Sequence, residues 1–201
     1  MGEIADEHQS YIADDLALMA AYGTDDYNEA YHLDRSLCGM PLVRGVDPRA
    51  QATDKLPAPG PLPYVSRRAL ARVKDRLPAP TRCNCCDGMV ELVSNAEIYH
   101  GREYGDWPYA YLCRGCGAYV GLHPNTDVPL GTLADKPTRE ARKSAKAVFM
   151  SLVGHLFKGD RTAGYAWLAA GMRIDPRRCH FGMFTVEQCA QAITFMNREA
   201  P

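Results

Sequence analysis

Two pairs of cysteines with the same internal spacing constrain this chain more than any other feature of its sequence. Cys83 and Cys86 form the first pair, and Cys113 and Cys116 form the second. Two residues between the thiols allow one tight turn to direct both sulfur atoms at a single metal ion. Four thiolates complete a tetrahedral shell that leaves no position for a substrate water. The spacing therefore predicts one structural zinc ion bound by these four side chains, in preference to ordinary buried or free thiols.

Cys85 lies inside the first pair and is an alternative ligand to either of its neighbours. The two-residue spacing and the Asp-Gly dipeptide after Cys86 favour Cys83 and Cys86. Gly88 and Gly117 come just after the pairs, where such turns often need backbone angles that glycine adopts easily. The 26 residues between the pairs exceed the usual range for a zinc ribbon. We expect a β-hairpin to accommodate the excess.

The composition indicates a globular protein. Hydrophobic residues make up 46% of the chain and charged residues 23%, which is enough apolar surface for a packed core. No apolar run approaches the roughly 18 residues of a membrane span, and the acidic N-terminus lacks the layout of a signal peptide. We therefore expect a cytoplasmic protein that binds no membrane and whose thiols stay reduced.

Charge divides the chain into three segments. Residues 1–55 contain eleven Asp/Glu and four Lys/Arg, whereas residues 56–82 contain six Lys/Arg and one acidic residue. Prolines at alternate positions within residues 56–82 predict an extended linker, interrupted by a short basic helix capped by Ser66. We predict an acidic helical N-terminal segment (1–55), a proline-rich basic linker (56–82), and a zinc-ribbon and helical domain (83–201).

Hydrophobic periodicity and capping residues predict the individual elements. Short strands are expected at 89–93 and 109–112, and a further apolar stretch follows at 118–122. Helices are expected at 3–22, from 25 or 26 to about 38, from the cap Asp135 to about 157, at 161–171 with Gly171 as its end, and at about 186–198 with Thr185 as its cap. The predicted fold class is α+β: a short antiparallel zinc ribbon packed with about three C-terminal helices, plus a helical N-terminal extension.

The stretch from CNCCDG through CGAYVGLHPNTDVPLGTLAD to CHFGMFTVEQC resembles the zinc-finger-containing domain family of phages and bacteria. The resemblance covers about residues 81–195, and CGAYVGLHP followed by PLGTLAD carries most of it. The four paired cysteines match the paired knuckles of that family, whose function is largely uncharacterised. The resemblance implies a phage or mobile-element accessory protein, in which case the expected location is the host cytoplasm.

A stripe of basic residues is predicted on the helix that follows Asp135. Arg139, Arg142, Lys143 and Lys146 recur at i, i+3, i+4 and i+7, and therefore share one helical face. Such a face contacts phosphates in many nucleic-acid-binding proteins. A solvated face over an apolar core gives the same pattern. We refer to these four residues as the basic stripe.

The acidic N-terminal segment suggests a second type of partner. One interpretation is that its negative charges imitate the phosphates of a nucleic acid and so bind a basic host protein. The other is that they are only solvated. The residues that we expect to contact such a partner are Asp14, Asp15, Asp25, Asp26 and Glu29.

Other chemistry-bearing residues fit less specific patterns. His123 is either a site residue or a loop histidine that fixes a turn through hydrogen bonds. A second zinc site formed by His155, Cys179, His180 and Cys189 requires the last helices to converge, and buried core thiols explain the cysteines equally well.

The predicted function is that of a non-catalytic zinc protein. No phosphate loop, H-E-x-x-H, G-x-S-x-G or deaminase motif occurs, so we expect no enzymatic activity. The leading hypothesis is an accessory protein that binds nucleic acid or a nucleoprotein complex through the basic stripe and the ribbon. The alternative is a protein-binding inhibitor of a host polymerase or defence complex that acts through the acidic segment, and an enzyme of unknown type ranks third.

Overall fold

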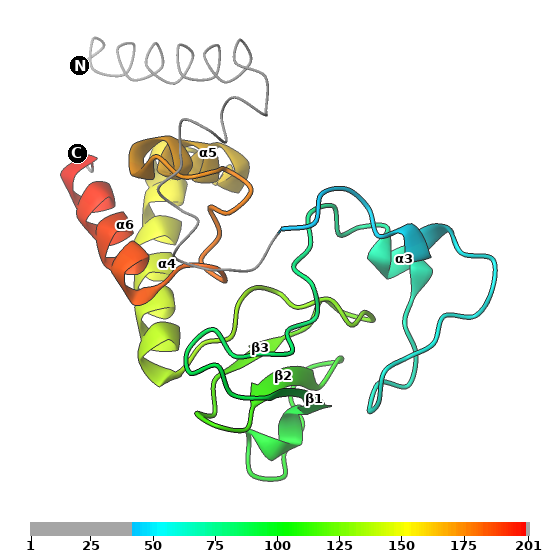
Figure 1. Ribbon diagram of the computed structural model, residues 1–201. Coiled ribbons are helices and arrows are strands. Elements are labelled where there is room, and N and C mark those ends of the chain that lie inside the picture. The colour runs from blue at the N-terminus through cyan, green and yellow to red at the C-terminus, as the bar shows by residue number, and fades with distance from the viewer. Residues whose placement is uncertain (1–41, 200–201) are drawn as a thin grey trace. The chain divides into compact units, whose positions relative to one another are not determined.

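The computed structural model describes residues 42–199 (Figure 1), so the helices predicted within residues 1–38 lie outside the described part. The chain divides into two compact units, which within the described residues comprise 42–142 and 143–199. The elements, in chain order, are η2 (Pro48–Gln51), α3 (Arg67–Leu70), β1 (Val90–Ser94), η3 (Asn95–Glu97), β2 (Tyr109–Cys113), β3 (Tyr119–Gly121), α4 (Lys136–Leu156), α5 (Arg161–Met172) and α6 (Val186–Glu199).

The first unit is built on a three-stranded antiparallel sheet with the order β1-β2-β3. Tyr111, in the middle of β2, pairs with Leu92 on β1 and with Val120 on β3. Cross-strand partners lie on the same face of a sheet, so these residues form one apolar row that turns toward the core. The two predicted strands occur as β1 and β2, with ends that differ by about one residue, and β3 lies within the apolar stretch 118–122.

Residues 56–77, which we expected to form an extended linker, contribute to the core of this unit. Their apolar side chains lie in the same cluster as Val90, Tyr111 and Val120. The alternating prolines do keep the backbone irregular, but an irregular backbone still buries side chains when they are spaced to face one surface. The buried side chains of this segment are those of Leu56, Leu62, Val65, Leu70, Val73 and Leu77.

The short basic helix predicted in this segment is confirmed as α3. The Ser66 hydroxyl accepts a hydrogen bond from the Ala69 amide at 3.3 Å, which satisfies one of the amides left unpaired at a helix N-terminus. The Ser66 amide in turn donates to the carbonyl of Asn125 at 2.9 Å. This bond anchors the start of α3 to the loop that follows β3.

The three C-terminal helices are also present where the sequence predicts them. Asp135 caps α4, because its carboxylate accepts a hydrogen bond from the Thr138 amide at 3.0 Å. At the start of α6, Thr185 and Gln188 form a reciprocal capping box, in which each side chain accepts from the other residue's amide. Within residues 42–199 no helix combines the length and the hydropathy that a bilayer span requires.

The prediction that Gly171 ends the fifth helix is wrong. Helix α5 continues to Met172, and Arg173 ends it by adopting a left-handed conformation with φ 55°. A Cβ atom added at Gly171 would lie only 1.9 Å from Cζ of Phe195 on α6. Gly171 is therefore required for the close packing of α5 against α6, and its role in the backbone is secondary.

Candidate metal centre

The first cysteine pair lies in a tight turn just before β1. The Cys83 amide donates to the Gly88 carbonyl at 2.9 Å, and the Asp87 amide donates back to the Cys83 carbonyl at 2.8 Å. Asp87 takes the left-handed conformation that this turn requires, with φ 57°. The turn therefore presents the sulfur atoms of Cys83 and Cys86 on the same side.

The second pair repeats this turn at the junction of β2 and β3. The Cys113 amide donates to the Ala118 carbonyl at 2.8 Å, and the Gly117 amide donates to the Cys113 carbonyl at 3.0 Å. Gly117 has φ 71° at the position that corresponds to Asp87. The two pairs thus form the same hydrogen-bonded motif twice, which is why sequence spacing alone identifies both.

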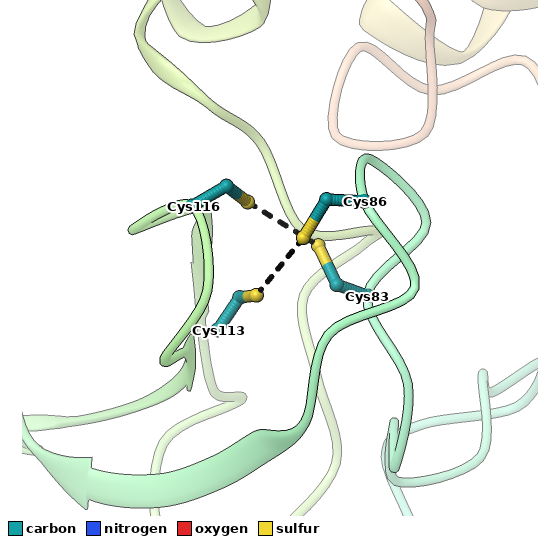
Figure 2. A group of neighbouring side chains, drawn as sticks. All are labelled: Cys83, Cys86, Cys113 and Cys116. Carbon is teal, nitrogen blue, oxygen red and sulfur yellow. Dashed lines mark hydrogen bonds between the residues drawn. The ribbon is translucent and has the colours of Figure 1, made fainter.

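Strand pairing brings the two turns together. Val90, near the end of the first turn, is paired directly with Cys113 on β2. The sulfur atoms of Cys83 and Cys116 lie 3.7 Å apart, and those of Cys86 and Cys113 lie 3.5 Å apart. All four sulfur atoms lie within 4.8 Å of one another (Figure 2).

These distances fit a tetrahedral zinc site. A Zn–S bond of about 2.3 Å gives sulfur–sulfur edges of about 3.8 Å in a regular tetrahedron. Every sulfur–sulfur distance quoted above is far longer than the roughly 2.05 Å of a disulfide bond. The four side chains therefore suit one structural zinc ion, which would occupy the space between them and contribute directly to the stability of the fold.

Burial and backbone amides affect the protonation of the four thiols differently. Burial raises the pKa of the Cys83 thiol to about 11. At Cys113 burial also opposes ionisation, but hydrogen bonds with the Cys116 amide, the Cys86 thiol, the Gly115 amide and the Cys116 thiol together lower the pKa to about 7. A thiolate is thus accessible at neutral pH, which is the form that a metal ion binds.

Cys85 is not one of the four clustered thiols. Its side chain is exposed, whereas its amide donates a hydrogen bond to the sulfur of Cys83 at 3.3 Å. The structure therefore brings together Cys83 and Cys86, which is the choice that the spacing favoured. Gly88 contributes space: a Cβ atom there would lie 3.1 Å and 3.2 Å from two of the sulfur atoms.

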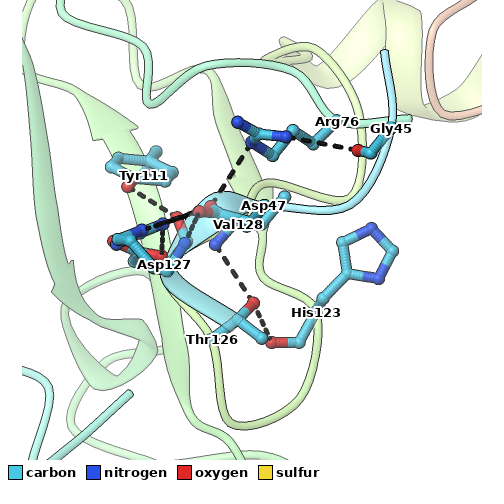
Figure 3. Close-up of polar contacts among 9 residues, drawn as sticks. Gly45, Asp47, Arg76, Tyr111, His123, Thr126, Asp127 and Val128 are labelled. Atoms are coloured by element: carbon cyan, nitrogen blue, oxygen red, sulfur yellow. Dashed lines mark hydrogen bonds and ion pairs between the residues drawn. The ribbon is translucent and has the colours of Figure 1, made fainter. Parts of the chain in front are cut away.

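A cluster of ion pairs connects the N-terminal part of this unit to the loop after β3 (Figure 3). Asp47, only 3% exposed, accepts hydrogen bonds from Arg49, and Arg76 lies 3.3 Å from its carboxylate. Arg49 also binds both carboxylate oxygens of Asp127, at 2.7 Å and 2.9 Å. The hydrogen bonds from Arg49 hold the pKa of Asp47 below its usual range. The Tyr111 hydroxyl, which donates to the Asp127 carbonyl, completes the link to the sheet.

The loop that contains His123 is fixed by its backbone and by a threonine. The His123 carbonyl accepts from both the amide and the hydroxyl of Thr126, and the His123 amide donates to the Val128 carbonyl at 2.8 Å. The imidazole lies outside this network (Figure 3), and burial lowers its pKa. Thr126 is fully buried and fixes the turn in the way that we had considered for His123.

A second metal site does not form among the residues that we considered for it. Within residues 42–199 the four paired cysteines are the only group of three or more potential ligands with a suitable arrangement. Cys179 and Cys189 are buried in the helical unit, and burial raises the pKa of Cys179 to about 12. Both behave as core residues.

The structure divides the basic stripe into two parts, of which the first anchors the start of α4. Arg139 donates to the Ala134 carbonyl at 2.7 Å. Arg142 donates to the carbonyl of Thr132 at 3.0 Å and to its hydroxyl at 2.7 Å. Both guanidinium groups therefore have a structural role, which the sequence pattern did not indicate.

The second part of the basic stripe is open to solvent. Lys143 and Lys146 are exposed, and neither forms an ion pair with any residue in the described part of the chain. The predicted partner-binding residues Asp14, Asp15, Asp25, Asp26 and Glu29 lie outside the described residues, so binding of a protein through the acidic segment stays a prediction.

Comparison with known proteins gives one match, which is to a protein family. Neither the curated proteins nor the solved structures contain a match to this chain. The family described as a zinc-finger-containing domain matches residues 79–199, which is more than half of the chain and includes both cysteine pairs. The chain therefore belongs to the zinc-finger-containing domain family.

Proposed function

We propose that this protein is a zinc-stabilised accessory protein, without catalytic activity, that binds nucleic acid or a nucleoprotein complex through α4. The four-cysteine cluster supports the structural role of the metal, because a shell of four thiolates has no open position for a reacting group. The proposed binding residues are the exposed part of the basic stripe and the ribbon, each considered within its own unit.

The charge of α4 is the observation that carries this proposal. The helix contains five Lys/Arg and a single glutamate. Lys136 and Arg139 lie in or next to its first turn, where the helix dipole disfavours positive charge. Arg139 and Arg142 are accounted for by their bonds to the carbonyls of Ala134 and Thr132. The exposed Lys143 and Lys146 have no such role among residues 42–199, and phosphate binding would account for their charge.

The test measures binding of the zinc-loaded protein to labelled mixed-sequence DNA and RNA as a function of salt. Because each phosphate contact releases counterions, the double substitution Lys143→Glu and Lys146→Glu should reduce the slope of log K against log salt by about 2. The matched control is Lys158→Glu with Arg161→Glu, which makes the same change of net charge at exposed positions beyond the stripe.

The control variant should bind like the wild-type protein. Equal losses in the two double variants would show that only the net charge matters, and would refute a defined surface on α4. A wild-type protein that binds neither DNA nor RNA at low salt would refute the proposed function altogether.

A further inference from the structure

Three tyrosines form a row on the first unit. The ring centroids of Tyr99 and Tyr104 lie 4.9 Å apart, and those of Tyr99 and Tyr119 lie 6.2 Å apart. Both pairs meet nearly edge to face, and the hydroxyl oxygens of Tyr99 and Tyr119 lie 3.2 Å apart. Tyr104 is 54% exposed and Tyr99 is 36% exposed, and neither belongs to the hydrophobic core of this unit. An exposed group of large aromatic side chains marks an interaction surface.

Strand register places Tyr119, against which Tyr99 packs, on the face of the sheet that turns away from the core. Tyr119 pairs with Leu112 of β2, which in turn pairs with Glu91 of β1. Side chains alternate along a strand, so these residues lie on the opposite face from Tyr111 and Val120. The row is therefore open to a partner without disturbing the packed side of the sheet.

The row adjoins the basic stripe. The guanidinium carbon of Arg139 lies 4.3 Å from the centre of the Tyr119 ring, a cation–π contact. Arg139 is the first residue of the stripe, and Lys143 and Lys146 follow it on the same face of α4. Within this unit, aromatic rings and a cation thus lie side by side from Tyr104 to Arg139 at the start of α4.

Glu91, on this face of the sheet, is paired within the protein, and so is Glu97. Arg114 binds Glu91 and Glu97 at 2.7 Å each. Glu91 lies on β1, two strands away from Tyr119 on β3. Glu91 is therefore separated from Arg139, whereas Asp135, the cap of α4, interacts electrostatically with that arginine.

We infer that the tyrosine row selects single-stranded nucleic acid, an inference that rests on the proposed function of the basic stripe. Unpaired bases stack on Tyr104 and Tyr99, while the phosphates of the same strand contact the start of α4 near Arg139. Base stacking on aromatic side chains is tolerant of sequence, and it requires bases whose faces are free, which a duplex does not offer.

A second aromatic group in the same unit does not have this character. The ring centroid of Trp107 lies 5.2 Å from that of Tyr64 and 5.0 Å from that of Tyr109. However, the indole N–H of Trp107 donates to the Thr126 carbonyl, and the ring packs against the core. Tyr64 itself is 45% exposed and lies outside the row. It is therefore the matched control for the loss of an exposed tyrosine.

The experiment compares three fluorescein-labelled probes with the zinc-loaded full-length protein: a 20-nucleotide single strand, its duplex, and the same strand with abasic sites in place of its central bases. We expect the intact strand to bind about ten-fold or more tightly than the abasic strand, because stacking of the bases is lost while the phosphates remain. The double substitution Tyr99→Leu and Tyr104→Leu should remove this difference. Tyr64→Leu should preserve it, and so should Tyr99→Phe with Tyr104→Phe, which keeps both rings.

The outcomes separate this inference from the proposed function. If charge reversal of Lys143 and Lys146 weakens binding but the abasic and intact strands bind equally well, the tyrosine row has no part in recognition and the inference fails alone. It also fails if the leucine variant keeps its zinc and its preference for the intact strand, or if the row binds a protein partner instead of any strand. If no probe binds the wild-type protein, both proposals fail.

Discussion

Deletion of residues 42–78 is expected to unfold the zinc ribbon, although the family match begins only at residue 79. The deleted segment supplies six buried apolar side chains to the core of the first unit. Full burial of one such side chain contributes about 1.5–3 kcal/mol, so their loss removes about 9–18 kcal/mol as an upper estimate. The whole stability of a domain is about 5–15 kcal/mol. The segment is therefore indispensable for the fold of this unit.

The assay compares two fragments, residues 42–201 and residues 79–201, each purified with zinc. We expect the longer fragment to unfold cooperatively on heating and to show dispersed amide signals by NMR. The shorter fragment should still bind zinc through its four cysteines, yet bind a hydrophobic dye and lack the cooperative unfolding transition of the first unit. A shorter fragment with a melting temperature within a few degrees of that of the longer one would refute the reasoning.

Three further predictions concern the metal centre and the ion cluster. Gly88→Ala should weaken zinc binding, measured by competition with a chromophoric chelator, by about 1–3 kcal/mol, because its Cβ atom would crowd two metal-bound sulfurs. Gly115→Ala, whose Cβ would lie at 3.4 Å and 3.7 Å from the same two sulfurs, should have a smaller effect, and equal effects would contradict this account. Removal of zinc with a strong chelator should abolish the tertiary structure of the first unit in near-UV circular dichroism, and re-addition should restore it. Because the pKa of Asp47 is lowered in the folded state, its ionised form stabilises the protein above the ordinary pKa of about 3.9, and this contribution is lost as the pH falls through the lowered value. Urea unfolding should therefore show that Asp47→Asn costs about 1–3 kcal/mol at neutral pH, and less as the pH falls from 5 toward 3.

The features that the sequence predicted best are those encoded by short-range patterns. The spacing of the cysteine pairs identified the metal centre because each turn closes over a few residues. The N-termini of α4 and α6 were predictable from their caps, Asp135 and Thr185, whose side chains accept hydrogen bonds from amides three residues further along the chain. Sequence reasoning succeeds here because the interacting groups are close neighbours along the chain.

The features that the sequence did not reveal depend on distant contacts. Arg49 and Asp127 form an ion pair across 78 positions, and no pattern in either segment indicates the other. Gly171 resembled a helix end, whereas the approach of Phe195 explains the glycine. Tyr99 and Tyr104 gave no periodic signal, because the loop between β1 and β2 places them next to Tyr119 only in the folded state.

The metal centre and the start of α4 are connected through a single segment of chain, residues 132–134. Its three carbonyl oxygens each accept a side-chain hydrogen bond: the first from Arg142, the third from Arg139, and the middle one from Asn84 at 3.1 Å. Asn84 lies between the two cysteines of the first pair, so its position depends on the turn that the metal fixes. The arginines that begin the basic stripe are thus held by the same segment as the first zinc-binding turn. It follows that zinc would do more than stabilise the ribbon: by ordering residues 132–134 it would also set the orientation of Arg139 over the Tyr119 ring, where the proposed binding surface begins.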